Sequence, residues 1–208
     1  ACANGSSELM SNVSSSIVGM VYNLQLMKYI GEDGVATYGV LMYVQFVFVA
    51  IFIGYSIGTA PIVGYNYGAT NYDELKNVRK KSIAIMFTTG ITLSIIAQLL
   101  AGTLAKIFVG YDQNLYVLTV HAFRIFSFAF ILTGFNIFSS SFFTALNNGA
   151  ISALIAFLRT LVFQLGSVIM LPLIISVDGI WLAICVAEVF ATAISLFFMI
   201  TKQKVYHY

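Results

Sequence analysis

The sequence is short of charged residues, prolines and cysteines. Only 9% of its 208 residues are charged, against about a quarter in an average soluble domain. A soluble domain of this size leaves much of its surface in water, so a chain that is 60% hydrophobic cannot hide its apolar side chains in one core. The scarcity of charge therefore argues against a soluble globule and favours a chain whose solvent is lipid.

Other absences exclude several classes of function. Cys2 and Cys185 are too few for a disulfide framework or a cysteine metal cluster. His121 and His207 are solitary, no His/Cys/acid group has metal-ligand spacing, and no glycine-rich loop matches a phosphate cradle. The net charge of +2, with no basic patch interleaved with aromatics, gives no sign of a nucleic-acid partner. We expect neither an enzyme nor a cofactor.

Long apolar runs fill most of the chain. A membrane-spanning helix needs roughly 20 mostly apolar residues. Six runs qualify, at about 9–28, 35–62, 82–105, 115–145, 151–175 and 180–201, and turn signals at 31–34, 65–74, 110–114, 147–149 and 176–179 separate them. The runs are continuous rather than alternating, which favours helices over a barrel. The sequence predicts an all-α integral membrane bundle of six helices.

The basic residues indicate an orientation in the membrane. Short cytoplasmic loops are enriched in Lys and Arg. The stretch after the second run and the tail after the sixth carry Lys76, Arg79, Lys80, Lys81, Lys202 and Lys204. The opposite side carries Lys28 and Lys106 together with Glu32, Asp33, Asp112 and Asp178. We therefore expect both ends of the chain on the cytoplasmic side of a cell membrane, most simply a bacterial cytoplasmic membrane.

Three stretches resemble the multidrug and toxic compound extrusion (MATE) family of transporters. They are 5–16 (GSSELMSNVSSS), which opens a run, 57–69 (IGTAPIVGYNYGA), which closes one, and 142–149 (FFTALNNG), which precedes the run that carries Arg159. In that family a proline and a Gly-x-x-x-Gly turn follow the second helix of each lobe, and residues 64–68 fit this place.

The resemblance implies one lobe of a twelve-helix transporter. Residues 1–208 would be the C-terminal lobe, and we interpret the chain as a fragment whose N-terminal lobe is missing. Some sodium-coupled members carry an acid deep in the first helix of this lobe, whereas this chain has Ser15 and Ser16 there and Glu8 nearer the cytoplasm. Proton-coupled members often use an acid of the first lobe. The coupling ion, proton or sodium, therefore stays open.

Glu188 is the most informative polar residue. It lies near the middle of the last run, where a charge costs roughly 2.5–3.5 kcal/mol and therefore has a partner or a task. It is either a coupling acid that exchanges protons or half of an interhelical ion pair with Arg159 or Arg124, and the structural interpretation is favoured. Thr192 and Ser195 follow on the same helix face.

The first run carries a polar stripe. Its members recur at intervals of three or four residues and so share one helix face: Glu8, Asn12, Ser15 or Ser16, Gly19 and Asn23. Such a stripe either packs helices together or lines a wet pathway. Tyr43 and Gln45 in the second run, where an aromatic ring can hold an organic cation, and Asn136 in the fourth run complete the candidate pathway residues.

Three functions fit these features. The first is a cation-coupled antiporter that exports organic, often cationic, drugs or toxic compounds. The second is a flippase for lipid-linked saccharides, which further basic residues beside Arg124 and Arg159 would favour. The third is a membrane scaffold or subunit that transports nothing, in which the polar stripe contacts partner helices. The expected partners are membrane lipid, a small organic substrate and the missing lobe.

Overall fold

The computed structural model describes residues 2–208, with side chains from residue 12 onward. This part of the chain is helical almost throughout and contains no strand. The elements are α1 (Cys2–Tyr29), α2 (Glu32–Gly68), α3 (Tyr72–Val109), α4 (Gln113–Phe126), η1 (Ser127–Ala129), α5 (Phe130–Ala145), α6 (Gly149–Phe157), η2 (Leu158–Gln164), α7 (Leu165–Met170), α8 (Pro172–Ile175), α9 (Val177–Thr201) and α10 (Gln203–Tyr206).

These elements form six rods that contain the six predicted runs. The fourth rod joins α4, η1 and α5, and the fifth joins α6, η2, α7 and α8. The last five rods are long and apolar enough to cross a membrane, and α1 has 28 residues. The rods α2 and α3, with 37 and 38 residues, extend roughly 55 Å and so reach well beyond a hydrocarbon layer about 30 Å thick.

The loop predicted at 65–74 is wrong in most of its length. The Gly-x-x-x-Gly stretch at 64–68 is the last turn of α2, and the chain reverses only at 69–71, where Thr70 adopts a φ of 56°. Gly, Asn and Tyr imitate a loop in composition, but the Asn66 amide is satisfied inside the helix by donating to the Ile62 carbonyl (2.9 Å). Asn71 then caps α3 by accepting from the Glu74 amide (3.4 Å).

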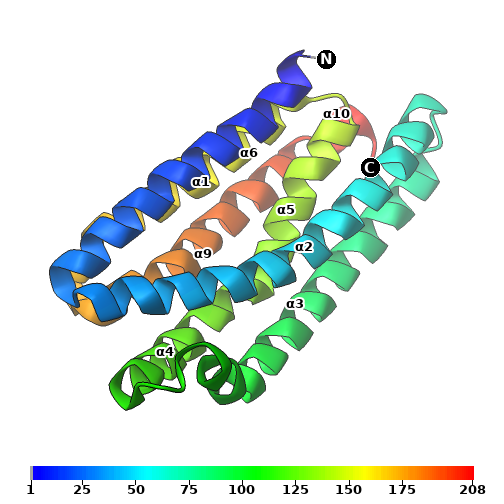
Figure 1. The fold of residues 1–208 in the computed structure, drawn as a ribbon. Coiled ribbons are helices and arrows are strands. Elements are labelled where there is room, and N and C mark those ends of the chain that lie inside the picture. The colour runs from blue at the N-terminus through cyan, green and yellow to red at the C-terminus, as the bar shows by residue number, and fades with distance from the viewer. Residues whose placement is uncertain (1) are drawn as a thin grey trace.

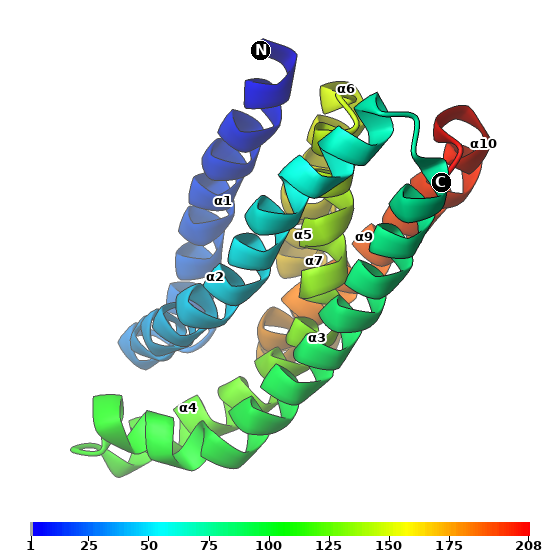
Figure 2. The ribbon, with the colours of Figure 1, turned by 90° about the vertical axis from the view of Figure 1, so that its right-hand side faces the viewer.

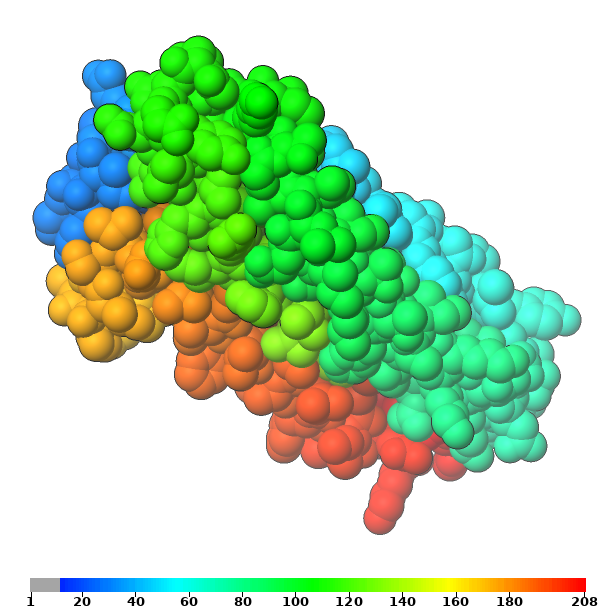
Figure 3. Space-filling view, turned by 90° about the horizontal axis from the view of Figure 1, so that it is seen from below, coloured from blue at the N-terminus to red at the C-terminus, as the bar shows by residue number. Residues whose placement is uncertain are grey.

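The helix α5 occupies the centre of the bundle. It packs against α2, α3, α6 and α9, while α1 lies along α6 at the edge (Figure 1). Gly90 permits the close approach of α3 to α5, since a Cβ at this position would lie 2.6 Å from the Phe130 carbonyl oxygen. On the face that Figure 3 presents, α3, α4 and α9 lie side by side.

The fourth rod bends at η1, so α4 runs across the end of the bundle instead of continuing α5 (Figure 2). A break inside a membrane leaves carbonyls that need partners. The Gln98 side chain of α3 supplies them, because its amide nitrogen donates to the Arg124 carbonyl (2.7 Å) and to the Ser127 hydroxyl (2.8 Å). The Cys185 thiol donates to the Ile125 carbonyl (3.3 Å).

The surface of the bundle is strongly apolar. Phe46 is 80% exposed, Leu99 77% and Ile107 71%, and many other large apolar side chains are exposed. Soluble monomers rarely expose contiguous apolar patches of more than a few hundred Å². The surface is therefore suited to lipid, as the composition indicated.

Candidate functional site

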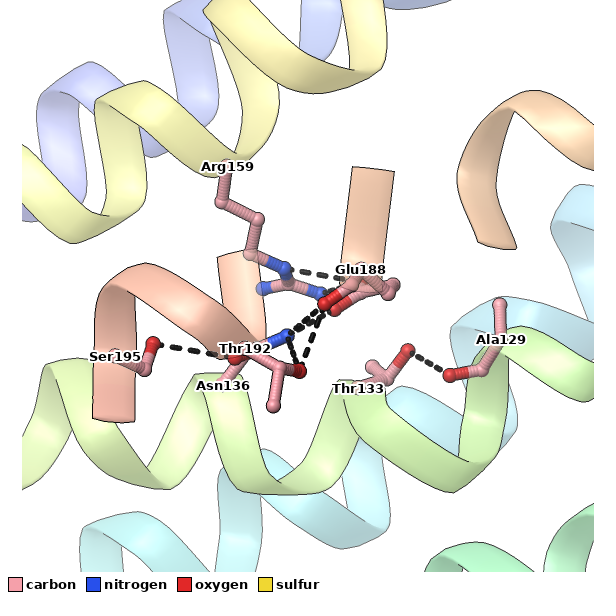
Figure 4. A network of polar contacts seen from close by, with 7 residues as sticks. All are labelled: Ala129, Thr133, Asn136, Arg159, Glu188, Thr192 and Ser195. Carbon is pink, nitrogen blue, oxygen red and sulfur yellow. Dashed lines mark hydrogen bonds and ion pairs between the residues drawn. The ribbon is translucent and has the colours of Figure 1, made fainter. Parts of the chain in front are cut away.

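The site centres on Glu188, which α9 places in the interior with only 2% of its surface exposed. The Arg159 guanidinium donates to Glu188 Oε1 through Nη2 (2.5 Å) and Nε (3.0 Å). The Asn136 side chain donates to Glu188 Oε2 (2.6 Å). Figure 4 shows these groups converging from η2, α5 and α9. Both carboxylate oxygens thus accept hydrogen bonds, Oε1 from a charged guanidinium and Oε2 from an amide.

Asn136 links several groups of this network, hereafter the Glu188 network. Its amide nitrogen also lies 3.1 Å from the Glu188 carbonyl oxygen and from Thr192 Oγ1, and its carbonyl oxygen accepts from the Ser195 hydroxyl (3.1 Å; Figure 4). Thr192 donates to the Glu188 carbonyl (2.7 Å). Positions 188, 192 and 195 share one face of α9, as expected. Asn136 of α5 forms hydrogen bonds with all three residues on that face.

The ion pair with Arg159 is the partnership predicted for Glu188. A buried carboxylate in a low-dielectric interior is strongly destabilising unless it is paired and hydrogen-bonded. The Arg159 side chain is 23% exposed and satisfies this need from one side, while Asn136 does so from the other. The pairing considered for Arg124 is wrong: its side chain is exposed on α4, on the far side of the η1 bend.

Arg159 lies on an unusual piece of backbone. Residues 158–164 form a π-helix, in which hydrogen bonds join residues five apart, within an otherwise α-helical rod. Such segments are rare and frequently occur at functional sites. The π-helix packs against α1 and α9, and its Arg159 side chain reaches the carboxylate of Glu188 on α9.

The polar stripe of α1 faces out of the bundle. The described members Asn12, Ser15, Ser16 and Asn23 are exposed, and Ser16 donates to the Asn12 carbonyl (3.1 Å). An adjoining face of α1 is buried in the lobe through Ser14, Val18, Tyr22 and Leu26. The exposed stripe is therefore available for contact with a second protein body or for lining a wet pathway. The side chain of Glu8 lies outside the described residues.

Tyr43 and Gln45 do not join the Glu188 network. Tyr43 is 69% exposed near the end of the bundle and stacks on Phe108 with ring centroids 6.1 Å apart. Gln45 is partly buried, and its Oε1 has no hydrogen-bond partner in the structure. Among the candidates, the structure brings together Asn136, Arg159 and Glu188 and leaves the stripe and the α2 residues as separate features.

Two polar contacts were missed from the sequence. Gln98 is an isolated amide in an apolar run, which was the available signal for its role at the η1 break. The other is His121, whose Nε2 lies 2.8 Å from Asp178 Oδ1 and so joins α4 to α9. Within the described residues, no three His, Cys, Asp or Glu side chains are grouped as a metal site would require.

Known proteins resemble this chain in sequence and in fold. The MatE family model matches residues 9–170. A curated relative is the probable multidrug resistance protein YoeA of Bacillus subtilis (strain 168), 26% identical over 121 residues, which is 58% of this chain and 26% of that protein.

Solved structures match over nearly the whole chain. A crystal structure of MATE in complex with MaL6 has a TM-score of 0.90 at 22% identity, covering 99% of this chain and 46% of that chain. An outward-facing multidrug resistance MATE family transporter of the MOP superfamily has a TM-score of 0.88 at 22% identity, covering 95% and 44%. The chain spans about a quarter of the curated relative and less than half of these structures.

Proposed function

The chain belongs to the MatE family, and from this premise we propose that it is one lobe of a cation-coupled antiporter that exports organic compounds across a cell membrane. The observation that carries the proposal is the exposed polar stripe of α1. A polar face in contact with lipid is costly, so an exposed one on a membrane helix belongs beside water or another polar surface. Many large apolar side chains are exposed elsewhere on the lobe, which makes this stripe our candidate for a transport pathway.

The proposal requires a second lobe that pairs with this chain. The matched transporter structures are about twice as long as this chain, which supports pairing with a lobe of similar size. Two lobes related by an axis along the membrane normal would enclose the stripe in a cleft that opens alternately to each side. We assign this chain to the C-terminal lobe, with both of its ends in the cytoplasm, as the basic residues indicate.

The export of one compound is driven by the entry of a cation, proton or sodium, when the two ligands weaken each other's binding. The stripe supplies amide and hydroxyl groups for polar parts of the substrate, and neighbouring apolar side chains such as Met20 and Leu24 suit its hydrocarbon parts. The Glu188 network holds η2, α5 and α9 together behind this face. We assign it a structural role, because both oxygens of the carboxylate are already engaged.

The test uses the complete protein that contains this chain, reconstituted in proteoliposomes. Export of a cationic dye is measured with a proton gradient, with a sodium gradient and with neither. Asn12→Leu and Asn23→Leu should reduce gradient-driven export at least tenfold with unchanged melting temperature. Leu99→Met, at an exposed apolar position on α3 and away from the stripe, should leave export unchanged. Dye movement that ignores both gradients, or stripe variants that transport normally, would contradict the proposal.

The role of Glu188 is tested separately. If it only holds helices together, the double variant Glu188→Gln with Arg159→Gln keeps the pH dependence of transport. A lost pH dependence in a correctly folded double variant would make Glu188 the coupling acid instead.

A further inference from the structure

Two basic segments far apart in the sequence meet at one end of the bundle. One is the beginning of α3, with Arg79, Lys80 and Lys81, and the other is the tail after α9, with Lys202 and Lys204. Figure 2 shows α10 beside the beginning of α3. The contact between them is direct, since the Arg79 guanidinium lies over the Tyr208 ring, 4.8 Å from its centroid. These five residues are called the basic cluster below.

Aromatic contacts fix the tail in this position. Tyr208 is fully buried and packs edge-on against Phe142 of α5, with centroids 5.0 Å apart. The Asn148 amide, just before α6, donates to the Tyr206 hydroxyl (2.6 Å), and Tyr67 at the end of α2 meets the Tyr206 ring at 5.6 Å. The basic cluster is therefore built on rigid elements.

The positive charge of the cluster is uncompensated. Of the nearby acids, Asp73 pairs with Lys76 (3.6 Å) and Glu74 accepts from Asn77 (3.1 Å). Within the described residues, none of the five cations in the basic cluster has a carboxylate at salt-bridge distance. The cluster would gain a partner by binding an anion.

The depth of the cluster selects the kind of anion. The apolar part of α3 begins at residue 82, so Arg79, Lys80 and Lys81 lie in the turn just outside the hydrocarbon layer. This is the level of lipid phosphates, and basic groups at this depth attract anionic lipid. Tyr65, 76% exposed in the last turn of α2, is a further residue suited to the membrane interface.

We propose that the basic cluster is a binding site for the headgroup phosphate of an anionic phospholipid. Arg79 presents a planar guanidinium that suits the oxygens of a phosphate, and the Tyr208 ring holds that plane in place. The lysines supply further charge around it, and the lipid chains lie along the apolar surface below. The site depends only on the membrane location of the chain and is independent of the transported substrate.

The experiment measures lipid binding to the complete protein in neutral detergent by native mass spectrometry. The probes are phosphatidylglycerol and phosphatidylcholine with identical acyl chains. Lys80→Gln with Lys81→Gln should weaken phosphatidylglycerol binding roughly 10- to 30-fold, as expected for the loss of two charges at the surface. The matched control, Lys28→Gln with Lys106→Gln, removes the same charge at the opposite end of the bundle and should leave the affinity unchanged.

Two further arms make the outcome decisive. Arg79→Lys keeps the charge but loses the planar donor set, and should weaken binding less than the double lysine variant. Melting temperatures in neutral detergent identify any variant that fails to fold. Equal binding of the two lipids, equal weakening in both double variants, or displacement of the lipid by millimolar inorganic phosphate would each overturn the proposal.

Discussion

Replacing Arg159 by Gln would leave the Glu188 carboxylate buried without its counter-charge. Removing one partner of a buried ion pair costs about 3–5 kcal/mol. The Glu188 side chain is 3% exposed but that of Arg159 is 23% exposed, so water already screens part of the interaction and the lower limit, about 3 kcal/mol, applies. For a chain of this size that corresponds to a fall in melting temperature of roughly 6–12 °C. Thermal unfolding in detergent, followed by the fluorescence of the buried Trp181, measures it.

Two companion variants separate charge burial from the loss of side-chain volume. Adding Glu188→Gln to Arg159→Gln removes the unpaired charge and should restore most of the lost stability, because neutral replacements of buried pairs are often nearly neutral in effect. Arg124→Gln removes an exposed arginine of another span and should change stability by less than about 0.5 kcal/mol. The reasoning is refuted if Arg159→Gln is as mild as Arg124→Gln, or if the double variant melts no higher than Arg159→Gln alone.

Three further perturbations test the packing, the helix break and the tail. Gln98→Leu removes the donor to the Arg124 carbonyl at the η1 bend and should cost about 1–3 kcal/mol in chemical unfolding; an unchanged midpoint would show that water replaces the amide. Gly90→Ala, whose Cβ would lie 2.6 Å from a backbone oxygen, should lower the melting temperature, whereas Gly58→Ala, with open space around it, should not. Burial raises the pKa of Tyr208 from about 10 to about 12, against the opposing charge of a nearby guanidinium. The folded state therefore keeps this proton longer, and the stability it contributes is present below pH 10 and lost as the pH rises through 12; Tyr208→Phe should remove that part of the alkaline titration.

The helical rods and the partner of Glu188 were predictable because both follow from the cost of polar groups in lipid. Apolar runs located the rods, and a carboxyl in the middle of one required a cation or a proton. Arg159 and Arg124 lie at similar depths in their runs, and the sequence did not distinguish them. The η1 bend decides between them, since it carries α4 and Arg124 away from the direction of α5.

Other features depend on contacts that a single sequence does not reveal. The end of α2 was misplaced because Asn66 counts as a turn former, although here its side chain bonds within the helix. The π-helix at 158–164 has no local signal among its mostly apolar residues, and it packs on α1 and α9, which lie far from it in the sequence. The outward direction of the α1 stripe was also undetermined, because periodicity gives a common face but not what that face meets.

The π-helix at 158–164 has a consequence for insertions and deletions. Its wider turns accommodate a residue that an α-helix of the same rise would exclude. Deleting one residue there would let the rod close into regular α-helix at nearly the same length, and the parts on either side would keep nearly their present directions, because the wide turns already absorb the extra residue. The change would be local to residues 158–164, the segment that carries Arg159. A single-codon deletion in this rod would therefore perturb the partner of Glu188 while leaving both flanking helices in place.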